Sequence, residues 1–322
     1  MSEETLRPPQ APPTDPTLPP LVTHALFGAP QSGKTTLLAA LETAATNNGR
    51  SFTPEPGPST DFFTKLRTAM APPKRFLPDR TELPDTLHIT FGPRRAARPR
   101  PVDLAFRLRI MDVAGRVTRD EEAGEAPSAE REAFIEFLAA CDGILFLVDP
   151  RRESEREQRD TNRHFRSALT RLAQRTGLHG MPRHVALCVT MLDHDPLLRR
   201  AAEAGFVTQD PHPPHLPRVR DRHARDFFEW LSHWPEQGGA REMHEALLAA
   251  FGEDAISYFV CSSVGFRLHD GRAVAMDRGR ENWQNISPSG DRHKLLGPMN
   301  PVNVLEPVET LVARVLEERD HA

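Results

Sequence analysis

The sequence predicts an α/β protein with three layers, in which helices cover both faces of a mostly parallel central sheet that contains one antiparallel strand pair. Short apolar runs typical of buried strands alternate along the chain with longer amphipathic segments typical of helices. The runs at 143–149 and 184–189 are almost uniformly apolar, as expected of parallel strands that are covered on both faces. Polar motifs follow the ends of several strands, which is where ligands of such sheets bind.

The strand-like run at 22–27 leads into a glycine-rich segment that fits the pattern G-x-x-x-x-G-K-[ST], and a helical pattern follows it. This is the pattern of a phosphate-binding P-loop, whose glycines let the backbone approach a phosphate and whose N–H groups point at the β-phosphate oxygens. Lys34 would reach the β- and γ-phosphates, and the Thr35 hydroxyl would hold Mg²⁺. The sequence therefore predicts a P-loop NTPase fold, with nucleotide contacts from Gly28, Ala29, Gln31, Ser32, Gly33, Lys34, Thr35 and Thr36.

Two alternating strand-like runs, 87–91 and 104–111, are joined by an arginine-rich connection and predict the antiparallel pair. The second run leads into the tetrapeptide D-V-A-G, which begins at Asp112 and ends at Gly115. A carboxylate at the end of a strand beside the P-loop strand would hold Mg²⁺ directly or through water, so Asp112 is the second candidate metal ligand. The backbone N–H of Gly115 would bond the γ-phosphate.

Two further motifs follow predicted strands. Thr190-Met191-Leu192-Asp193 comes directly after the run at 184–189, and Cys261-Ser262-Ser263 comes directly after the run at 255–260. The carboxyl ends of parallel strands meet at one edge of a sheet, so we expect these motifs, the P-loop and Asp112 to lie at the same edge.

Composition limits the class of protein. The 322 residues are 38% hydrophobic and 27% charged, which allows a globular core, and a net charge of −4 argues against a dedicated nucleic-acid binder. The three cysteines Cys141, Cys188 and Cys261 lie far apart, in or beside apolar runs, and predict buried free thiols in a reducing compartment. No apolar run is long enough to span a membrane, so we expect a cytoplasmic protein with no integral membrane segment.

The chain divides into a tail and one large domain. Residues 1–20 are rich in proline and predict a disordered tail. Residues 21–322 predict a single P-loop domain with inserts at about 47–84, 194–254 and 266–306.

The order of these motifs resembles that of a Ras-like P-loop GTPase of the translation-factor-related class. Thr190 to Asp193 resembles the family motif [NT]-K-x-D, whose aspartate accepts hydrogen bonds from guanine N1–H and N2–H₂. Ser262 and Ser263 resemble the S-A-K loop, whose backbone contacts guanine O6. The resemblance implies GTP or GDP and Mg²⁺ as cofactors, and it implies that Thr190, Met191, Asp193, Ser262 and Ser263 bind the guanine base.

The long inserts and the ending P-V-N-V-L-E-P at 301–307 resemble the bacterial double-GTPase group. Members of that group are thought to be encoded beside a second GTPase in multi-gene systems linked to biological conflict and defence. This resemblance implies a molecular switch that acts with a protein partner, for which a second GTPase is the first candidate.

The sequence departs from the family pattern at three places. Met191 replaces the motif lysine; its stem can cover the base, but it loses polar contacts with the P-loop and so predicts weaker base selectivity. Arg116 follows Gly115 where Ras-like enzymes often place the glutamine that orients water, which predicts slow or partner-dependent hydrolysis. Lys34, Gly115 and Arg116 are the candidate catalytic positions. No first-switch threonine stands out, since Thr81 competes with Thr64, Thr68 and Thr86.

Two other functions fit the same residues. A P-loop enzyme that uses ATP, such as a kinase, would bind adenine and be insensitive to Asp193→Ala. A nucleotide-bound scaffold that hydrolyses little would fit the substitution at Arg116.

Overall fold

The computed structural model describes residues 18–29, 31–72, 75, 77, 86–94, 103–112, 135–151, 166, 169–170, 182–234, 238–273, 283–289 and 292–321. Most of the predicted tail lies outside these residues, as do Thr81, Gly115 and Arg116. No helix of the described part is both long and apolar enough to cross a membrane.

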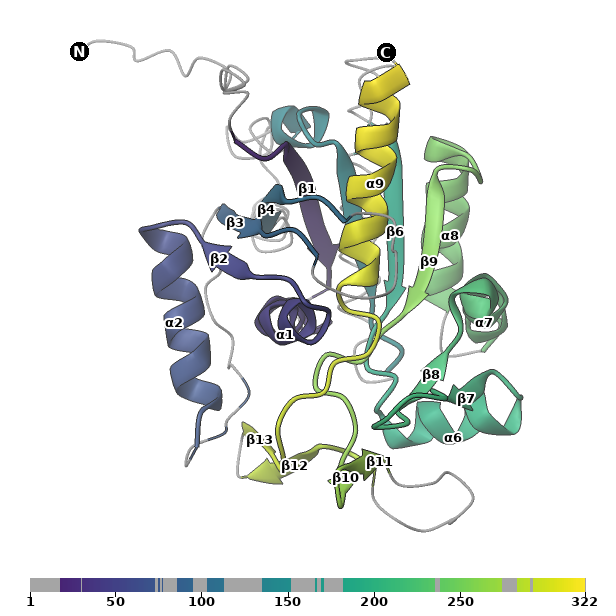
Figure 1. The fold of residues 1–322 in the computed structure, drawn as a ribbon. Helices are drawn as coiled ribbons and strands as arrows, with labels where there is room; N and C mark the ends of the chain where they lie inside the picture. The colour runs from purple at the N-terminus through teal and green to yellow at the C-terminus, as the bar shows by residue number, and fades with distance from the viewer. Residues whose placement is uncertain are drawn as a thin grey trace, which may run out of the picture.

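The centre of the molecule is a seven-stranded sheet in the order β2-β3-β4-β1-β5-β6-β9 (Figure 1). Five strands run parallel: β1 (Leu21–Gly28), β4 (Phe106–Asp112), β5 (Gly143–Val148), β6 (His184–Val189) and β9 (Ile256–Val260). Two run antiparallel to their neighbours at one edge: β3 (Leu87–Phe91), paired with β4, and β2 (Phe52–Pro54), paired with β3. The predicted fold is thus confirmed, and β2 extends the antiparallel edge by a strand that the sequence did not predict.

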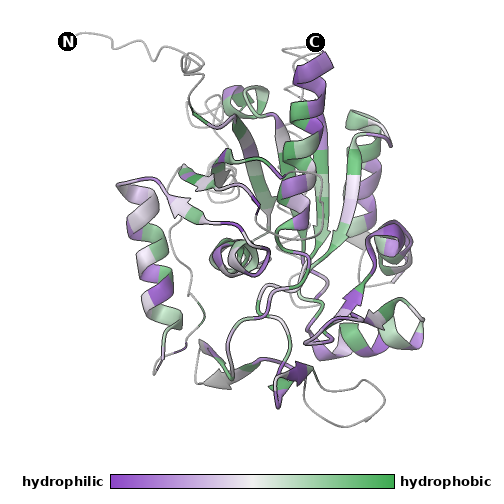
Figure 2. Ribbon diagram, viewed as in Figure 1, coloured by the Kyte–Doolittle hydropathy of each residue, from purple (hydrophilic) through white to green (hydrophobic). Residues whose placement is uncertain are grey.

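Helices cover both faces of the sheet (Figure 1). In β1, Val22 and Leu26 belong to a core with α1 (Lys34–Asn47), α2 (Pro58–Met70) and α9 (Glu306–His321). Ala25 and Phe27 belong to the opposite core with α6 (Asp195–Glu203), α7 (Ala224–Ser232) and α8 (Gly238–Phe251). Successive side chains of a strand point to opposite faces, so a strand buried on both sides is apolar throughout. Figure 2 shows this as hydrophobic colouring along the central strands.

Small two-stranded sheets lie within the regions predicted as inserts. β7 (Val207–Gln209) pairs with β8 (Pro217–Val219), and the turn η4 (Asp221–His223) leads from β8 into α7. Near the C-terminus, β10 (Leu268–His269) pairs with β11 (Arg272–Ala273), and β12 (Ile286–Ser289) pairs with β13 (Arg292–Leu295). These short pairs extend the loops that follow the carboxyl ends of β6 and β9.

A histidine lies buried in the core of the molecule. His24, in β1, is 1% exposed, and neither ring nitrogen has a hydrogen-bond partner among the described residues. Burial, with a smaller contribution from the charge of the neighbouring His184, lowers the pKa of His24 to about 3. His24 is therefore neutral in the folded protein at pH 5, where an exposed imidazole would be protonated.

We expect stability to fall as the pH drops from 7 to 5. The unfolded chain protonates His24 near pH 6.5 and the folded protein only near pH 3, so acid favours the unfolded state. The contribution of this one group is about 2 kcal/mol at pH 5. Urea unfolding should therefore show the variant His24→Leu losing about 2 kcal/mol less than the original chain between these pH values. An equal loss in both proteins would contradict the role of His24.

Candidate functional site

The loop between β1 and α1 is a tight turn with two positions that require glycine. A Cβ on Gly28 would lie 2.5 Å from Ser32 Oγ and 3.0 Å from Leu147 Cβ, so no larger residue fits there. Gly33 has a φ of 91°, in the left-handed region that favours glycine. The Ser32 N–H donates to Ala29 O over 3.1 Å and closes the turn. The loop therefore wraps closely around the N-terminus of α1.

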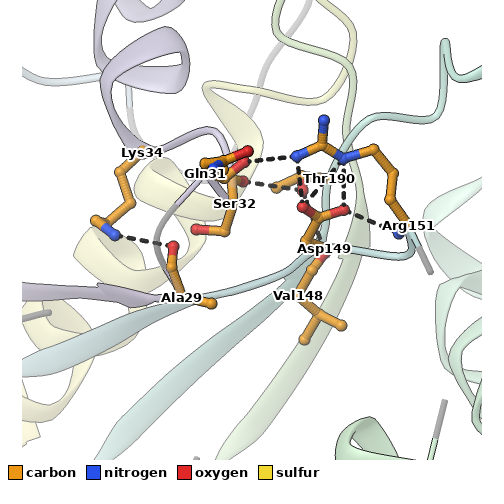
Figure 3. Close-up of polar contacts among 8 residues, drawn as sticks. All are labelled: Ala29, Gln31, Ser32, Lys34, Val148, Asp149, Arg151 and Thr190. Atoms are coloured by element: carbon orange, nitrogen blue, oxygen red, sulfur yellow. Dashed lines mark hydrogen bonds and ion pairs between the residues drawn. The ribbon is translucent and has the colours of Figure 1, made fainter. Parts of the chain in front are cut away.

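Two polar side chains of this loop lie close to the loop's own backbone. The Lys34 ammonium donates to Gly28 O over 2.7 Å and to Ala29 O over 3.1 Å, and the two bonds hold it at the loop. Figure 3 shows the contact with Ala29. The Ser32 side chain is fully buried, and its hydroxyl has no hydrogen-bond partner among the described residues. A buried hydroxyl without a partner costs about 1–3 kcal/mol, which a bound acceptor would offset.

This arrangement suits an anion. The loop ends at the N-terminus of α1, where helix N–H groups and the helix dipole favour negative charge. Thr35 and Thr36 lie in the first turn of that helix and are half-buried. Asp112 is the last residue of β4 and lies in register with Leu26 of β1, one strand away from the loop. The structure does not describe the Asp112 side chain.

The loop after β6 packs directly against the P-loop. Thr190 donates its Oγ1–H to Ser32 O at 3.1 Å or to Val148 O at 3.2 Å, and its N–H donates to Val148 O over 2.9 Å. The Met191 methyl carbon lies 3.6 Å from where a Cβ on Gly33 would stand. The structure therefore brings Thr190 and Met191 into contact with the P-loop, although more than 150 residues separate them in sequence.

Asp193 is held in place by the loop after β9. It is 4% exposed, and Ser262 Oγ donates to its Oδ1 over 2.5 Å. The same hydroxyl accepts the N–H of Gly265 over 2.9 Å. Burial raises the pKa of Asp193 to about 6, and the hydrogen bond from Ser262, a backbone hydrogen bond and the positive charge of Arg151 oppose that rise. Ser263 follows in the same loop and is half-buried.

Sequence reasoning missed an ion pair at this edge. Asp149 follows β5 directly and is fully buried, and its carboxylate binds the Arg151 guanidinium, with Nη2 to Oδ2 at 2.7 Å. The same Nη2 donates to Gln31 O of the P-loop over 3.0 Å (Figure 3). The signal was available, because Asp149 stands directly after a buried parallel strand, as Asp112 does.

A family model described as Double-GTPase 2 matches residues 25–232. A search of curated proteins finds no match. Among solved structures, the chain is similar to the Ski7 GTPase-like domain of S. cerevisiae bound to GTP, with 12% identity and a TM-score of 0.41, over 92% of this chain and 50% of that one. It is also similar to Sup35 complexed with GDP, with 13% identity and a TM-score of 0.32, over 79% of this chain and 40% of that one.

The chain spans half or less of the length of these solved chains, and the likeness to them is distant. The family match covers well over half of the chain and contains both the P-loop and the loop that carries Asp193. The protein therefore belongs to the Double-GTPase 2 family.

Proposed function

We propose that this protein is a Mg²⁺-dependent switch that binds and hydrolyses GTP. The observation that carries the proposal is the hydrogen bond from Thr190 to Ser32 O, which joins the loop of Asp193 to the P-loop. Lys34 and Asp193 therefore border the same edge of the sheet, where one nucleotide would reach both. Membership of the Double-GTPase 2 family supports guanine as the base.

The phosphates would bind at the P-loop. The Lys34 ammonium would neutralise charge on the β- and γ-phosphates, and the loop N–H groups and the Ser32 hydroxyl would donate to phosphate oxygens. The Thr35 hydroxyl and the Asp112 carboxylate would hold Mg²⁺, which supplies charge stabilisation to the leaving phosphate when bound. The N–H of Gly115 would bond the γ-phosphate. We propose that hydrolysis is slow without a partner, since Arg116 stands where a water-orienting glutamine is usual.

The base would bind between the loops that follow β6 and β9. Ionised Asp193 would accept the two guanine N–H groups, which adenine cannot offer in this arrangement. The Met191 stem would cover the base, and Thr190, Ser262 and Ser263 would fix the shape of the pocket. The bond from Ser262 to Asp193 supports this role, because it leaves the carboxylate a single orientation.

GDP affinity should fall below pH 6. Because burial raises the pKa of Asp193 to about 6, this carboxyl must lose a proton before it can accept the guanine N–H groups. We expect binding at pH 5 to be about tenfold weaker than at pH 7.5 from this group alone. The terminal phosphate also titrates near pH 6, so Asp193→Asn serves as the control. If calorimetry finds the same pH dependence in both proteins, Asp193 does not bind the base.

The function is tested by titrating the protein with GTP and ATP in the presence of Mg²⁺. We expect a preference for GTP and measurable hydrolysis in a single turnover. Equal affinity for the two nucleotides would remove guanine from the proposal and favour an ATP-using enzyme. Tight GTP binding without hydrolysis would favour the second candidate, a nucleotide-bound scaffold, which Arg116 motivates.

We also propose that the switch acts in the cytoplasm with a protein partner. In Ras-like switches the γ-phosphate orders nearby loops, which then present a surface to another protein. The regions at 59–84 and 115–127 would play that part here. The family description, Double-GTPase 2, makes a second GTPase the first partner to test, by co-purification in the presence of GTP and of GDP.

A further inference from the structure

Met191 stands where the family motif has a lysine, so the polar contact of that lysine with the P-loop is missing. It stands in the loop that must keep Asp193 at a fixed distance from the P-loop, and its side chain packs over Gly33. A thioether has no N–H to donate, so Met191 cannot bond the carbonyl oxygens of the P-loop, as a lysine at this position could. Any charged link between the base side of the site and the P-loop has to come from elsewhere.

Arg151 makes such a link. Its Nη2 donates to Gln31 O over 3.0 Å, and Gln31 is a non-glycine residue with a φ of 64°. A residue in this left-handed conformation costs energy, so an outside bond to its carbonyl helps to hold the turn. Thr190 bonds the next carbonyl, Ser32 O. Two successive carbonyls of the P-loop are therefore held from the side on which Asp193 lies.

Asp149 fixes the direction of the guanidinium. The carboxylate is fully buried and accepts three groups of Arg151: Nη2 at 2.7 Å, Nε at 3.1 Å and the backbone N–H at 2.9 Å. Figure 3 shows the guanidinium lying between Asp149 and Gln31. A side chain gripped in this way has already lost its rotational freedom, so its bond to the P-loop is pre-organised.

The charge of Arg151 also acts on the base side. It favours the ionised form of Asp193, in opposition to burial, which raises the pKa of that carboxyl. Arg151 therefore bonds the P-loop directly, and its charge makes a minor contribution at Asp193.

We propose that Arg151, oriented by Asp149, is a positioning residue that replaces the missing lysine at Met191 and keeps the P-loop aligned with Asp193. This inference rests on the proposed function, because it assumes that one guanine nucleotide spans the two parts. The inference predicts that a positive charge at position 151 and one at position 191 can replace each other. A positive group at either place should suffice for tight and selective binding.

The test is a double-mutant cycle on GDP affinity. The variant D149N/R151M removes both charges together, so that no buried carboxylate is left unpaired. The amide oxygen at position 149 can still accept the backbone N–H of residue 151. We expect the variant to bind GDP about tenfold more weakly, with a smaller preference over ADP, because a charge-assisted hydrogen bond is lost. Adding M191K should restore most of that loss, so the gain in affinity that M191K gives in D149N/R151M should exceed its effect in the original chain by at least about threefold.

Thermal unfolding of each variant verifies that it is folded. The matched surface control is Arg183→Ala. Arg183 lies just before β6, at the amino ends of the parallel strands and so away from the site, where it is exposed and pairs with Glu318. Equal effects of M191K in the two backgrounds, or unchanged GDP affinity in D149N/R151M, would overturn the inference and leave the proposed function intact. An original chain that binds GDP no better than ADP would overturn the proposed function instead.

Discussion

Lys34→Ala will lower the rate of single-turnover GTP hydrolysis by about 10²–10³-fold, because the ammonium is the nearest fixed positive charge to the β- and γ-phosphates in the proposed complex. The structure holds this group at the loop through bonds to Gly28 O and Ala29 O. The charge is therefore in place before the nucleotide binds, and little reorganisation is needed. Rapid mixing of GTP with excess protein measures the effect on the chemical step.

The matched control is Arg183→Ala. Arg183 is exposed just before β6, at the amino ends of the parallel strands, so its removal deletes one positive charge away from the loop and should change the rate less than twofold. Lys34→Met retains the aliphatic stem and separates loss of charge from loss of packing. Hydrolysis at the original rate in both Lys34 variants would mean that the triphosphate does not bind at this loop.

The sheet was predictable because its strands carry local signals. The runs at 87–91 and 184–189 match β3 and β6 residue for residue. A strand buried on both faces has a continuous apolar run, and a strand buried on one face has alternating apolar residues, so both patterns can be recognised in the sequence. β2 was missed because it has three residues, one of them Pro54, in a region interrupted by prolines and glycines. α6 was missed because its apolar residues are few: Leu197, Leu198 and Ala201 face the core.

The site was predictable only where a motif is contiguous. The P-loop and the tetrapeptide at 190–193 are patterns of adjacent residues, so their chemistry can be read before the fold is known. The bond from Arg151 to Gln31 joins residues 120 positions apart, and although Asp149 follows a buried strand, nothing in the sequence indicates that the neighbouring arginine bonds the P-loop. Such contacts depend on which strands become neighbours, here β1 and β5, which the sheet order decides.

A contact between the C-terminal helix and the rest of the fold also joins residues far apart in sequence, so the sequence alone does not predict it. Arg50, just after α1, donates from Nε to Glu309 Oε1 of α9 over 2.7 Å, across 259 residues. Both side chains are buried, at 0% and 1% exposure. The Arg50 Nη1 also donates to Gly92 O over 2.7 Å, next to β3. One arginine therefore joins α1, α9 and the antiparallel edge of the sheet.

We expect Glu309→Ala to lower the free energy of unfolding by about 3–5 kcal/mol, because it leaves the Arg50 guanidinium buried without its counter-charge. Urea unfolding measures this loss without the added ionic strength of a salt denaturant. The matched control is Glu317→Ala, which removes an exposed glutamate from the same helix and should change stability by less than about 0.5 kcal/mol.

A paired replacement separates charge from packing. Arg50→Met with Glu309→Leu removes both charges of this pair and retains most of the buried volume, so it should cost less than Glu309→Ala alone. The part of the loss that remains includes the ion pair between Glu309 Oε2 and Arg94 Nη1, at 4.0 Å. If instead the paired replacement is as destabilising as the single change, the arginine stabilises the fold mainly through its bonds to backbone carbonyls and its stacking 5.3 Å from the centre of the Phe106 ring. Arg50 lies just after the C-terminal end of α1, and the N-terminal end of α1 contributes to the P-loop. If the ion pair of Arg50 and Glu309 also helps to position the P-loop, Glu309→Ala should lower GDP affinity as well as stability.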